Sequence, residues 1–201
     1  EQAWRDSAGV VLVACHVGNN EVVAAGVAKR GWPISVVADD SAFPELFEIL
    51  RRQRESWGVH VIPWRNLREV FGVLRRHEML ALLVDWGYRD DGIPVRLFGA
   101  WTTLPAGPAA LAAKTGASIL PITIRRRPDD TFLVQLEPPF TVPSSSPADL
   151  LHASQSIAAA LERTIGAAPE QWYNFKPMWP ETEAEAEALA ARAERMAANL
   201  P

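Results

Sequence analysis

Cysteine is almost absent from this chain of 201 residues, which holds only Cys15. A single cysteine cannot form an internal disulfide and leaves no cysteine-based metal motif, a pattern that fits a reducing compartment. Cys15 lies in an apolar run, so we expect a buried thiol. No set of spaced ligands accompanies the histidines either, and we expect neither a metal nor a bound cofactor.

Long apolar runs are also missing. No stretch approaches the roughly 18 uninterrupted apolar residues of a membrane-spanning helix, and the first residues do not form a secretory signal. Residues 1–201 are therefore expected to be soluble or peripheral. The chain has no initiating methionine and only a few residues before its first strand-like run. We therefore expect a missing N-terminal segment that anchors the intact protein to a membrane.

Positive charge is in the minority, with a formal net charge of −4 and a sequence pI of about 5.6. This balance argues against a domain whose main task is binding nucleic acid. Two catalytic motifs are absent as well. The chain has no glycine-rich fingerprint for nucleotide phosphates and no Gly-x-Ser-x-Gly elbow of a serine hydrolase.

What the chain does contain is a large apolar fraction, 48%, enough for one domain with a sizeable core. The valine-rich run 9–14 is continuous, as in a strand buried on both faces of a parallel sheet. A helix is expected over 20–30, closed by Gly31, and a second strand over 34–38. These three segments form a βαβ unit, which favours an α/β fold.

The remaining segments continue this alternation. Helices are expected at 41–57, 65–77, 107–115 and 148–166, and strands at 59–62, 80–84, 95–98, 119–124 and 131–136, the last two forming a hairpin. A loop is expected between 98 and 107. Residues 181–199 are rich in alanine and glutamate with a thin apolar stripe, which predicts a solvent-facing, partly frayed terminal helix.

His16 and Glu21 are the first candidates for catalysis, because His16 lies where the first strand gives way to a helix, a common place for sites in α/β sheets. An imidazole can accept a hydroxyl proton, and a nearby carboxylate can fix its tautomer. Five residues apart is not one face of a regular helix, so the pair meets only if the turn at Gly18 and Asn19 folds the backbone between them. The residues alone leave open a purely structural hydrogen-bonded pair.

Arg54 and Asp85 are further candidates. A guanidinium binds phosphate or carboxylate through paired hydrogen bonds, although an arginine at a helix end can also be a solvated residue favoured by the helix dipole. Asp85 follows the strand-like run 80–84 and could serve catalysis, cap a helix or form a structural salt bridge. The run Arg125-Arg126-Arg127 adds basic character to an acidic chain, and either anionic headgroups or solvent could face it.

Several motifs occur together in a fixed order. They are His-x4-Glu at 16–21, Arg-Glu-Ser-Trp-Gly-Val at 54–59, Leu-Leu-Val-Asp at 82–85, Leu-Phe-Gly at 97–99, the run 104–117 and Pro-Glu-Gln-Trp at 169–172. This order and spacing resembles the bacterial lipid A biosynthesis lauroyl and myristoyl acyltransferases and the related phosphatidylinositol mannoside acyltransferases. The resemblance covers residues 9–175. Asn20, where many relatives carry tryptophan, and Trp86, where they usually carry glutamine, depart from it.

The resemblance implies a catalytic dyad of His16 as general base and Glu21 as its orienting partner. It also implies functional roles for Arg54 and Asp85, and a looser match places Asp39 at an acidic position of the mannoside enzymes. We assign substrate binding to these residues and to the turn between the dyad partners, that is, to Arg54, Asp85, Asp39, Gly18 and Asn19. Together with the βαβ pattern, the resemblance predicts a three-layer α/β/α domain with a mostly parallel sheet over residues 1–180, followed by a helical tail over 181–201.

The implied reaction moves a fatty acyl group from an acyl thioester, either acyl-CoA or acyl-carrier protein, to a hydroxyl of a membrane glycolipid. The partners would be this donor, the glycolipid and the membrane surface, at the cytoplasmic face of the inner membrane. Two alternatives remain. One is acylation of a lysophospholipid or glycerol phosphate, whose enzymes usually show a Phe-Pro-Glu-Gly type motif that is absent here, and the other is a non-catalytic lipid-binding module.

Overall fold

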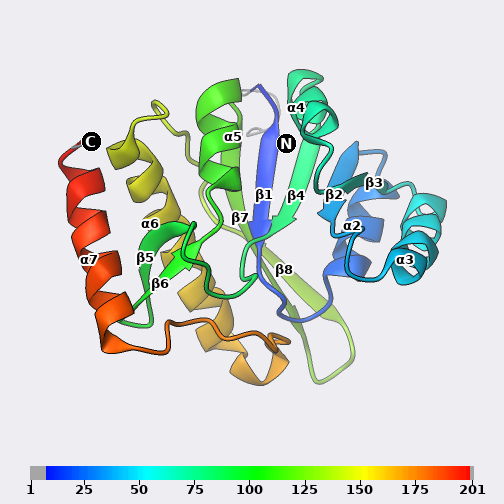
Figure 1. The fold of residues 1–201 in the computed structure, drawn as a ribbon. Helices are drawn as coiled ribbons and strands as arrows, with labels where there is room; N and C mark the ends of the chain where they lie inside the picture. The colour runs from blue at the N-terminus through cyan, green and yellow to red at the C-terminus, as the bar shows by residue number, and fades with distance from the viewer. Residues whose placement is uncertain (1–7, 200–201) are drawn as a thin grey trace.

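The computed structural model describes residues 8–199, and a central β-sheet with helices on both sides dominates it (Figure 1). Residues 1–7 and 200–201 lie outside the described residues. They include the first seven residues of the predicted catalytic domain and the last two of the predicted tail. The three-layer α/β arrangement predicted from the sequence is confirmed.

The central sheet has six strands in the order β3-β2-β4-β1-β7-β8. Their bounds are β1 Val10–Ala14, β2 Ile34–Ala38, β3 His60–Pro63, β4 Met79–Leu83, β7 Ser118–Arg126 and β8 Phe132–Leu136. Every neighbouring pair is parallel except β7 and β8, which form the predicted antiparallel hairpin. All five residues of β1 are buried, as expected for an unbroken apolar strand in the middle of a parallel sheet.

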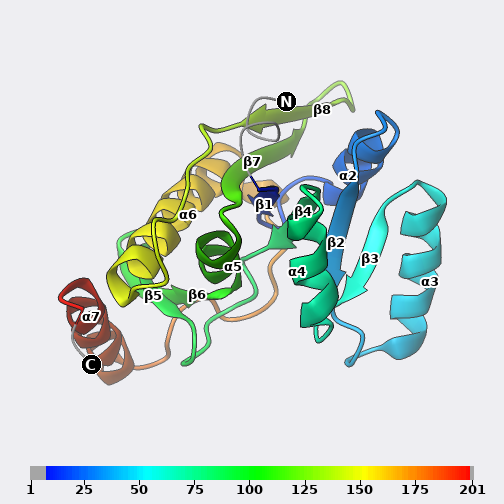
Figure 2. The ribbon, with the colours of Figure 1, turned by 90° about the horizontal axis from the view of Figure 1, so that it is seen from above.

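Helices cover both faces of the sheet (Figure 2). Helix α2 (Asn20–Ala28) lies on one face, and α3 (Pro44–Ser56) flanks the β3 edge; α4 (Leu67–Arg75), α5 (Gly107–Thr115) and α6 (Pro147–Ala167) lie on the other face. Right-handed crossovers explain this division, because the chain moves outward from β1 through β2 to β3 and then returns to β4. Asn19, Asn66 and Ser146 cap the first turns of α2, α4 and α6 with their side chains.

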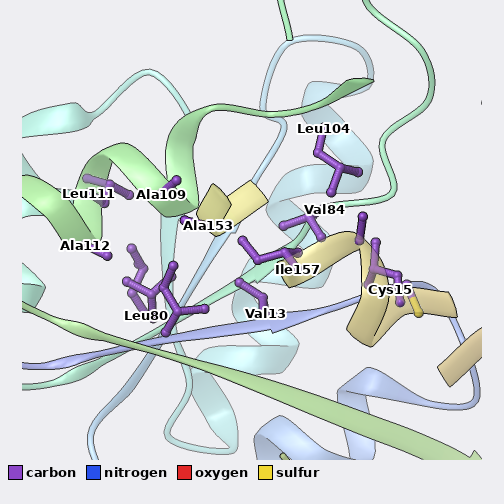
Figure 3. Packing of buried hydrophobic residues seen from close by; sticks show 14 of the residues in the cluster. Val13, Cys15, Leu80, Val84, Leu104, Ala109, Leu111, Ala112, Ala153 and Ile157 are labelled. Carbon is purple, nitrogen blue, oxygen red and sulfur yellow. The ribbon is translucent and has the colours of Figure 1, made fainter. Parts of the chain in front are cut away.

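Alternate residues of β1 contribute to two separate cores. Val11 and Val13 belong to the larger cluster, between the sheet and the helices α4, α5 and α6. Figure 3 shows Val13 near Leu80 and Ile157 in this cluster. Val10 and Leu12 point to the opposite face and belong to the smaller cluster beside α2. The two-residue period of a strand thus gives the two faces of the sheet different packing partners.

The segment after β5 (Ile93–Leu97) corrects one prediction. The expected loop is instead a strand, β6 (Ala100–Leu104), paired antiparallel with β5 in a separate two-stranded sheet. Phe98 and Gly99, both with positive φ, form the two-residue turn, a geometry that suits hairpins. The hydroxyl of Thr103, buried in β6, donates to the carbonyl of Arg89 at 2.6 Å, so the polar side chain is satisfied.

Helix α7 (Glu183–Ala197) differs from the predicted tail in its packing. It begins with a capping box between Thr182 and Glu185 and packs against α6, β5 and β6. Leu189 and Ala193 are buried in that contact, so the helix is not simply solvent-facing. Within residues 8–199, no helix combines the length and apolar character needed to cross a membrane.

Candidate active site at the carboxyl edge of the sheet

The parallel register of β1 and β4 brings His16 and Asp85 together. Ala14 lies opposite Leu83 at the carboxyl ends of the two strands, and both chains continue for two further residues. His16 Nδ1 then lies 2.7 Å from Asp85 Oδ1, and the His16 backbone N–H donates to Asp85 Oδ2 at 2.9 Å. Asp85 therefore holds both the ring and the main chain of His16.

The Asp85 carboxylate is fully enclosed, with 0% of its side chain exposed, whereas the His16 side chain is 36% exposed. Trp172 Nε1 donates a further hydrogen bond to Asp85 Oδ2 at 2.8 Å. Burial acts to raise the pKa of Asp85, but the hydrogen bonds from His16 and Trp172 outweigh it and hold the pKa below its ordinary value. In the tautomer with a proton on Nδ1, the ring donates to Asp85 and Nε2 is the ring's proton acceptor.

The segment after α6 fastens this arrangement from the other side. Tyr173 N–H donates to the carbonyl of His16 at 2.7 Å, and Asn174 Nδ2 donates to the carbonyl of Asp85 at 3.0 Å. Gly18 N–H donates to the carbonyl of Gln171 at 3.2 Å. The roles of Trp172 and Asn174 were not predicted, although Trp172 closes the Pro-Glu-Gln-Trp motif of the family resemblance.

The sequence predicts that Glu21 orients His16, but in the structure the Glu21 carboxylate has another hydrogen-bond partner, Arg54. Arg54 Nε donates to Glu21 Oε2 at 2.9 Å, and Arg54 Nη2 donates to the other oxygen. This paired geometry is characteristic of a guanidinium and a carboxylate. The carboxylate that is hydrogen-bonded to the His16 ring is thus that of Asp85, whereas Glu21 is paired with Arg54. Glu21 lies in the first turn of α2 and Arg54 in the last turn of α3, so this ion pair joins the two helices.

Gly18 and Asn19 shape that loop. Gly18 has φ of +67°, and a Cβ there would lie 2.8 Å from the carbonyl oxygen of Ile124, so both the backbone and the space require glycine. Asn19 accepts from the Val22 N–H at 3.1 Å and caps α2. Asn20 Nδ2 donates to the carbonyl of Cys15 at 3.1 Å. Gly18 and Asn19 therefore both stabilise the loop that follows His16.

Asp39 and Cys15 lie nearby with different environments. Asp39 follows β2 at the same sheet edge and accepts from the backbone and hydroxyl of Ser41, which lower the pKa of its carboxyl. The structure does not bring it to His16 by any described hydrogen bond. Cys15 is buried, as predicted, and burial together with the charge of Asp85 raises the pKa of its thiol. A protonated, enclosed thiol is not a nucleophile.

An apolar pocket opens beside this site on the α2 face. It has a volume of about 190 Å³ and is lined by side chains from the sheet and from α2. Asn20, Glu21 and Arg54 line it near His16. Trp32, Ile34 and Met79 line it at the amino ends of β2 and β4, where Met79 is paired with both Val10 and Ile34. The pocket therefore follows β1 for about 13 Å at the usual strand rise.

No cluster of metal-ligating side chains occurs in residues 8–199. The site thus consists of a histidine hydrogen-bonded to a carboxylate at the carboxyl edge of a mostly parallel sheet, with an apolar pocket nearby whose lining includes an arginine–glutamate pair. Such an arrangement is suited to proton transfer next to an apolar ligand.

Comparison with known proteins places the chain in a family. Residues 1–181 match the family model described as bacterial lipid A biosynthesis acyltransferase, and the chain belongs to this family. Phosphatidylinositol mannoside acyltransferase of Mycolicibacterium smegmatis is 27% identical over 176 residues, covering 85% of this chain and 57% of the relative. The enzyme of that name from Mycobacterium tuberculosis is 29% identical and is 54% covered. The chain thus spans little more than half the length of these relatives.

Proposed function

We propose that the chain carries the active site of an acyltransferase that moves a fatty acyl group from an acyl thioester to a hydroxyl of a membrane glycolipid. The donor is acyl-CoA or acyl-carrier protein. The observation that carries the proposal is the His16–Asp85 hydrogen bond, made two residues beyond Ala14, which lines the apolar pocket. Family membership and the mannoside acyltransferase relatives support the same reaction class and a glycolipid acceptor.

In the proposed mechanism, the apolar pocket holds the acyl chain and brings the thioester carbonyl to His16. Nε2 takes the proton of the acceptor hydroxyl while the hydroxyl oxygen forms a bond to the carbonyl carbon of the thioester. Asp85 stabilises the resulting imidazolium. The tetrahedral intermediate then collapses, the carbon–sulfur bond breaks, and the thiolate receives the proton from His16. The products are an ester and a free thiol, with no acyl-enzyme.

The pair of Glu21 and Arg54 has a positioning role in this scheme. It joins α2 to α3 at the opening of the apolar pocket, with the Arg54 side chain 18% and the Glu21 side chain 44% exposed. By fixing the first turn of α2, the pair holds one wall of the pocket against the sheet. The guanidinium of Arg54 has further N–H groups, which can form hydrogen bonds to an anionic group of the acyl donor.

The catalytic roles can be separated by a thiol-release assay with acyl-CoA or acyl-carrier protein and glycolipid in micelles. His16→Ala and Asp85→Asn are each expected to lower acceptor-dependent release by at least about a hundredfold, because general base catalysis is lost. Glu21→Gln should lower it by less than about tenfold, because a partly exposed ion pair contributes little.

Circular dichroism and thermal unfolding serve as controls, which must show that each variant retains the fold. Release that persists unchanged in His16→Ala would contradict the mechanism and favour a non-catalytic lipid-binding module. If Glu21→Gln abolished thiol release and Asp85→Asn did not, the orienting role would belong to Glu21.

The length of the acyl chain is proposed to depend on Trp32, because its ring lines the pocket at the end remote from His16. Trp32→Ala is expected to shift the preference toward longer donors, since each additional buried methylene contributes about 0.8 kcal/mol, or roughly fourfold. The measurement is the ratio of kcat/KM values for a series of acyl-CoA donors.

The matched control for this experiment is Trp101→Ala, because Trp101 lies in β6 of the separate two-stranded sheet and does not line the pocket. Trp32→Phe should give an intermediate preference. An unchanged length profile in Trp32→Ala, with the fold intact, would show that another side chain closes the pocket.

A membrane-facing surface is proposed at the carboxyl edge of the sheet, on the cytoplasmic face of the inner membrane. Large apolar side chains are exposed in the segments that follow β2, β3, β4 and α6, namely Phe43, Trp64, Leu67, Trp86, Tyr173 and Phe175. Cations accompany two of these rings, with Lys176 over Trp86 and Arg65 over Trp64. Rings and cations together suit an interface with anionic lipid.

Phe175 offers the sharpest test of this surface because it is 94% exposed. Phe175→Ser is expected to weaken co-sedimentation with vesicles that contain anionic phospholipid, since one large apolar anchor is lost. Phe98→Ser, at an exposed phenylalanine in the β5–β6 turn, is the control. Equal losses in the two variants would contradict a defined membrane-facing surface.

A further inference from the structure

A second cavity, of about 750 Å³, lies beside the loop that follows His16. We call it the basic pocket, and its lining includes Gly18, Asn19, Arg125, Arg127, Gln171 and Tyr173. Unlike the apolar pocket, it is surrounded largely by polar groups, among them the last residues of β7 and the segment after α6. The proposed acyl transfer gives it no role.

The basic pocket is lined by three arginines and two carboxylates, so its lining has an excess of positive charge, although Asp129 beside it also interacts electrostatically with Arg127. Arg126 forms an ion pair with Asp130 at 2.8 Å. Among residues 8–199, by contrast, neither Arg125 nor Arg127 has a carboxylate within ion-pair distance. Glu170 also lines the cavity without pairing with either. Arg125 is half-buried, and a partly desolvated guanidinium without a counter-ion favours binding of an anion.

The walls of the basic pocket are fastened to the site at His16. Gln171 accepts from the backbone N–H of Arg126 at 2.8 Å and donates to its carbonyl at 3.0 Å. The next two residues, Trp172 and Tyr173, hold Asp85 and His16. One short segment therefore fixes the position of the arginines relative to the imidazole, as a preorganised binding site requires.

The two pockets lie on opposite faces of the sheet, and their linings include residues that flank His16 in the chain, Ala14 and Gly18. Ile122 and Ile124 of β7 line the apolar pocket on the α2 face. Thr123 points the other way, where its hydroxyl lies 2.8 Å from that of Thr164 in α6. Strand alternation places Arg125 on the same side as Thr123. An acyl chain in the apolar pocket would thus leave the basic pocket available to the second substrate.

We propose that the basic pocket binds a phosphate group in the headgroup of the acceptor lipid, with Arg125 as its main ligand and Arg127 as a second. This inference rests on the proposed acyl transfer. The names of the relatives already point to a phosphate-bearing glycolipid, and the inference adds the place where its phosphate binds. A guanidinium donates paired hydrogen bonds to phosphate oxygens, which lysine cannot reproduce. Binding there holds the headgroup hydroxyl near Nε2 of His16.

The kinetic test compares two acceptors in neutral detergent micelles, a phosphatidylinositol mannoside and an uncharged glycosyl diacylglycerol. Arg125→Ala and Arg125→Glu are expected to raise KM for the phosphate-bearing acceptor by about tenfold or more, because a charge-assisted contact is lost. Their kcat, their KM for acyl-CoA and their use of the uncharged acceptor should change less than about twofold. Arg125→Lys should recover part of the loss.

Arg75→Ala is the matched control, since Arg75 is exposed at the end of α4, lines neither pocket and lies at the opposite edge of the sheet. A second measurement uses no donor and no turnover. Calorimetry with glycerophosphoinositol, the soluble headgroup, should show binding that Arg125→Glu abolishes and Arg75→Ala retains.

The outcomes separate this inference from the proposed function. Arg125-dependent headgroup binding in a protein that transfers no acyl group would uphold the basic pocket and overturn the acyltransferase proposal. Normal transfer with an Arg125→Ala variant that matches the parent on both acceptors would overturn the basic pocket alone. A rise in KM for acyl-CoA, with the acceptor unaffected, would also overturn it and assign the phosphate contact to the donor.

Discussion

The buried carboxylate of Asp85 is the constraint on which the site depends. An ionised group with no exposed side-chain surface is stable only when hydrogen bonds replace the water it has lost. Its partners come from two distant parts of the chain, the end of β1 and the segment after α6. The hydrogen bonds that satisfy this buried charge fix the imidazole of His16 and hold the segment after α6 against the sheet. They also keep the pKa of Asp85 below its ordinary value.

The two acidic residues considered as partners of His16 have different surroundings and different hydrogen-bond partners. Asp85 is enclosed and touches His16 directly, whereas Glu21 is partly exposed and is held by Arg54. The sheet divides the site in a similar way. Alternate residues of β1 face the α2 side or the α6 side, and the apolar pocket and the basic pocket lie on these two sides of the sheet.

Local patterns in the sequence predicted much of the fold. The apolar run of β1, the turn before α2 and the β7–β8 hairpin depend on neighbouring residues, and each occurs as expected. Strand β6 was missed because Trp101, Thr102 and Thr103 sit between turn residues and pair only with β5. The partner of His16 could not be deduced from spacing. Asp85 is 69 residues away, and only the register between β1 and β4 brings it near, while Glu21, five residues away, is turned toward α3.

The most direct test of this account is nitrogen and proton NMR of the His16 ring in protein labelled at histidine. We predict that the neutral imidazole carries its proton on Nδ1, with a downfield signal from the hydrogen bond to Asp85, and that Nε2 is unprotonated. Asp85→Asn should remove that signal, while Glu21→Gln leaves it in place. A signal that survives Asp85→Asn and disappears in Glu21→Gln would contradict the account.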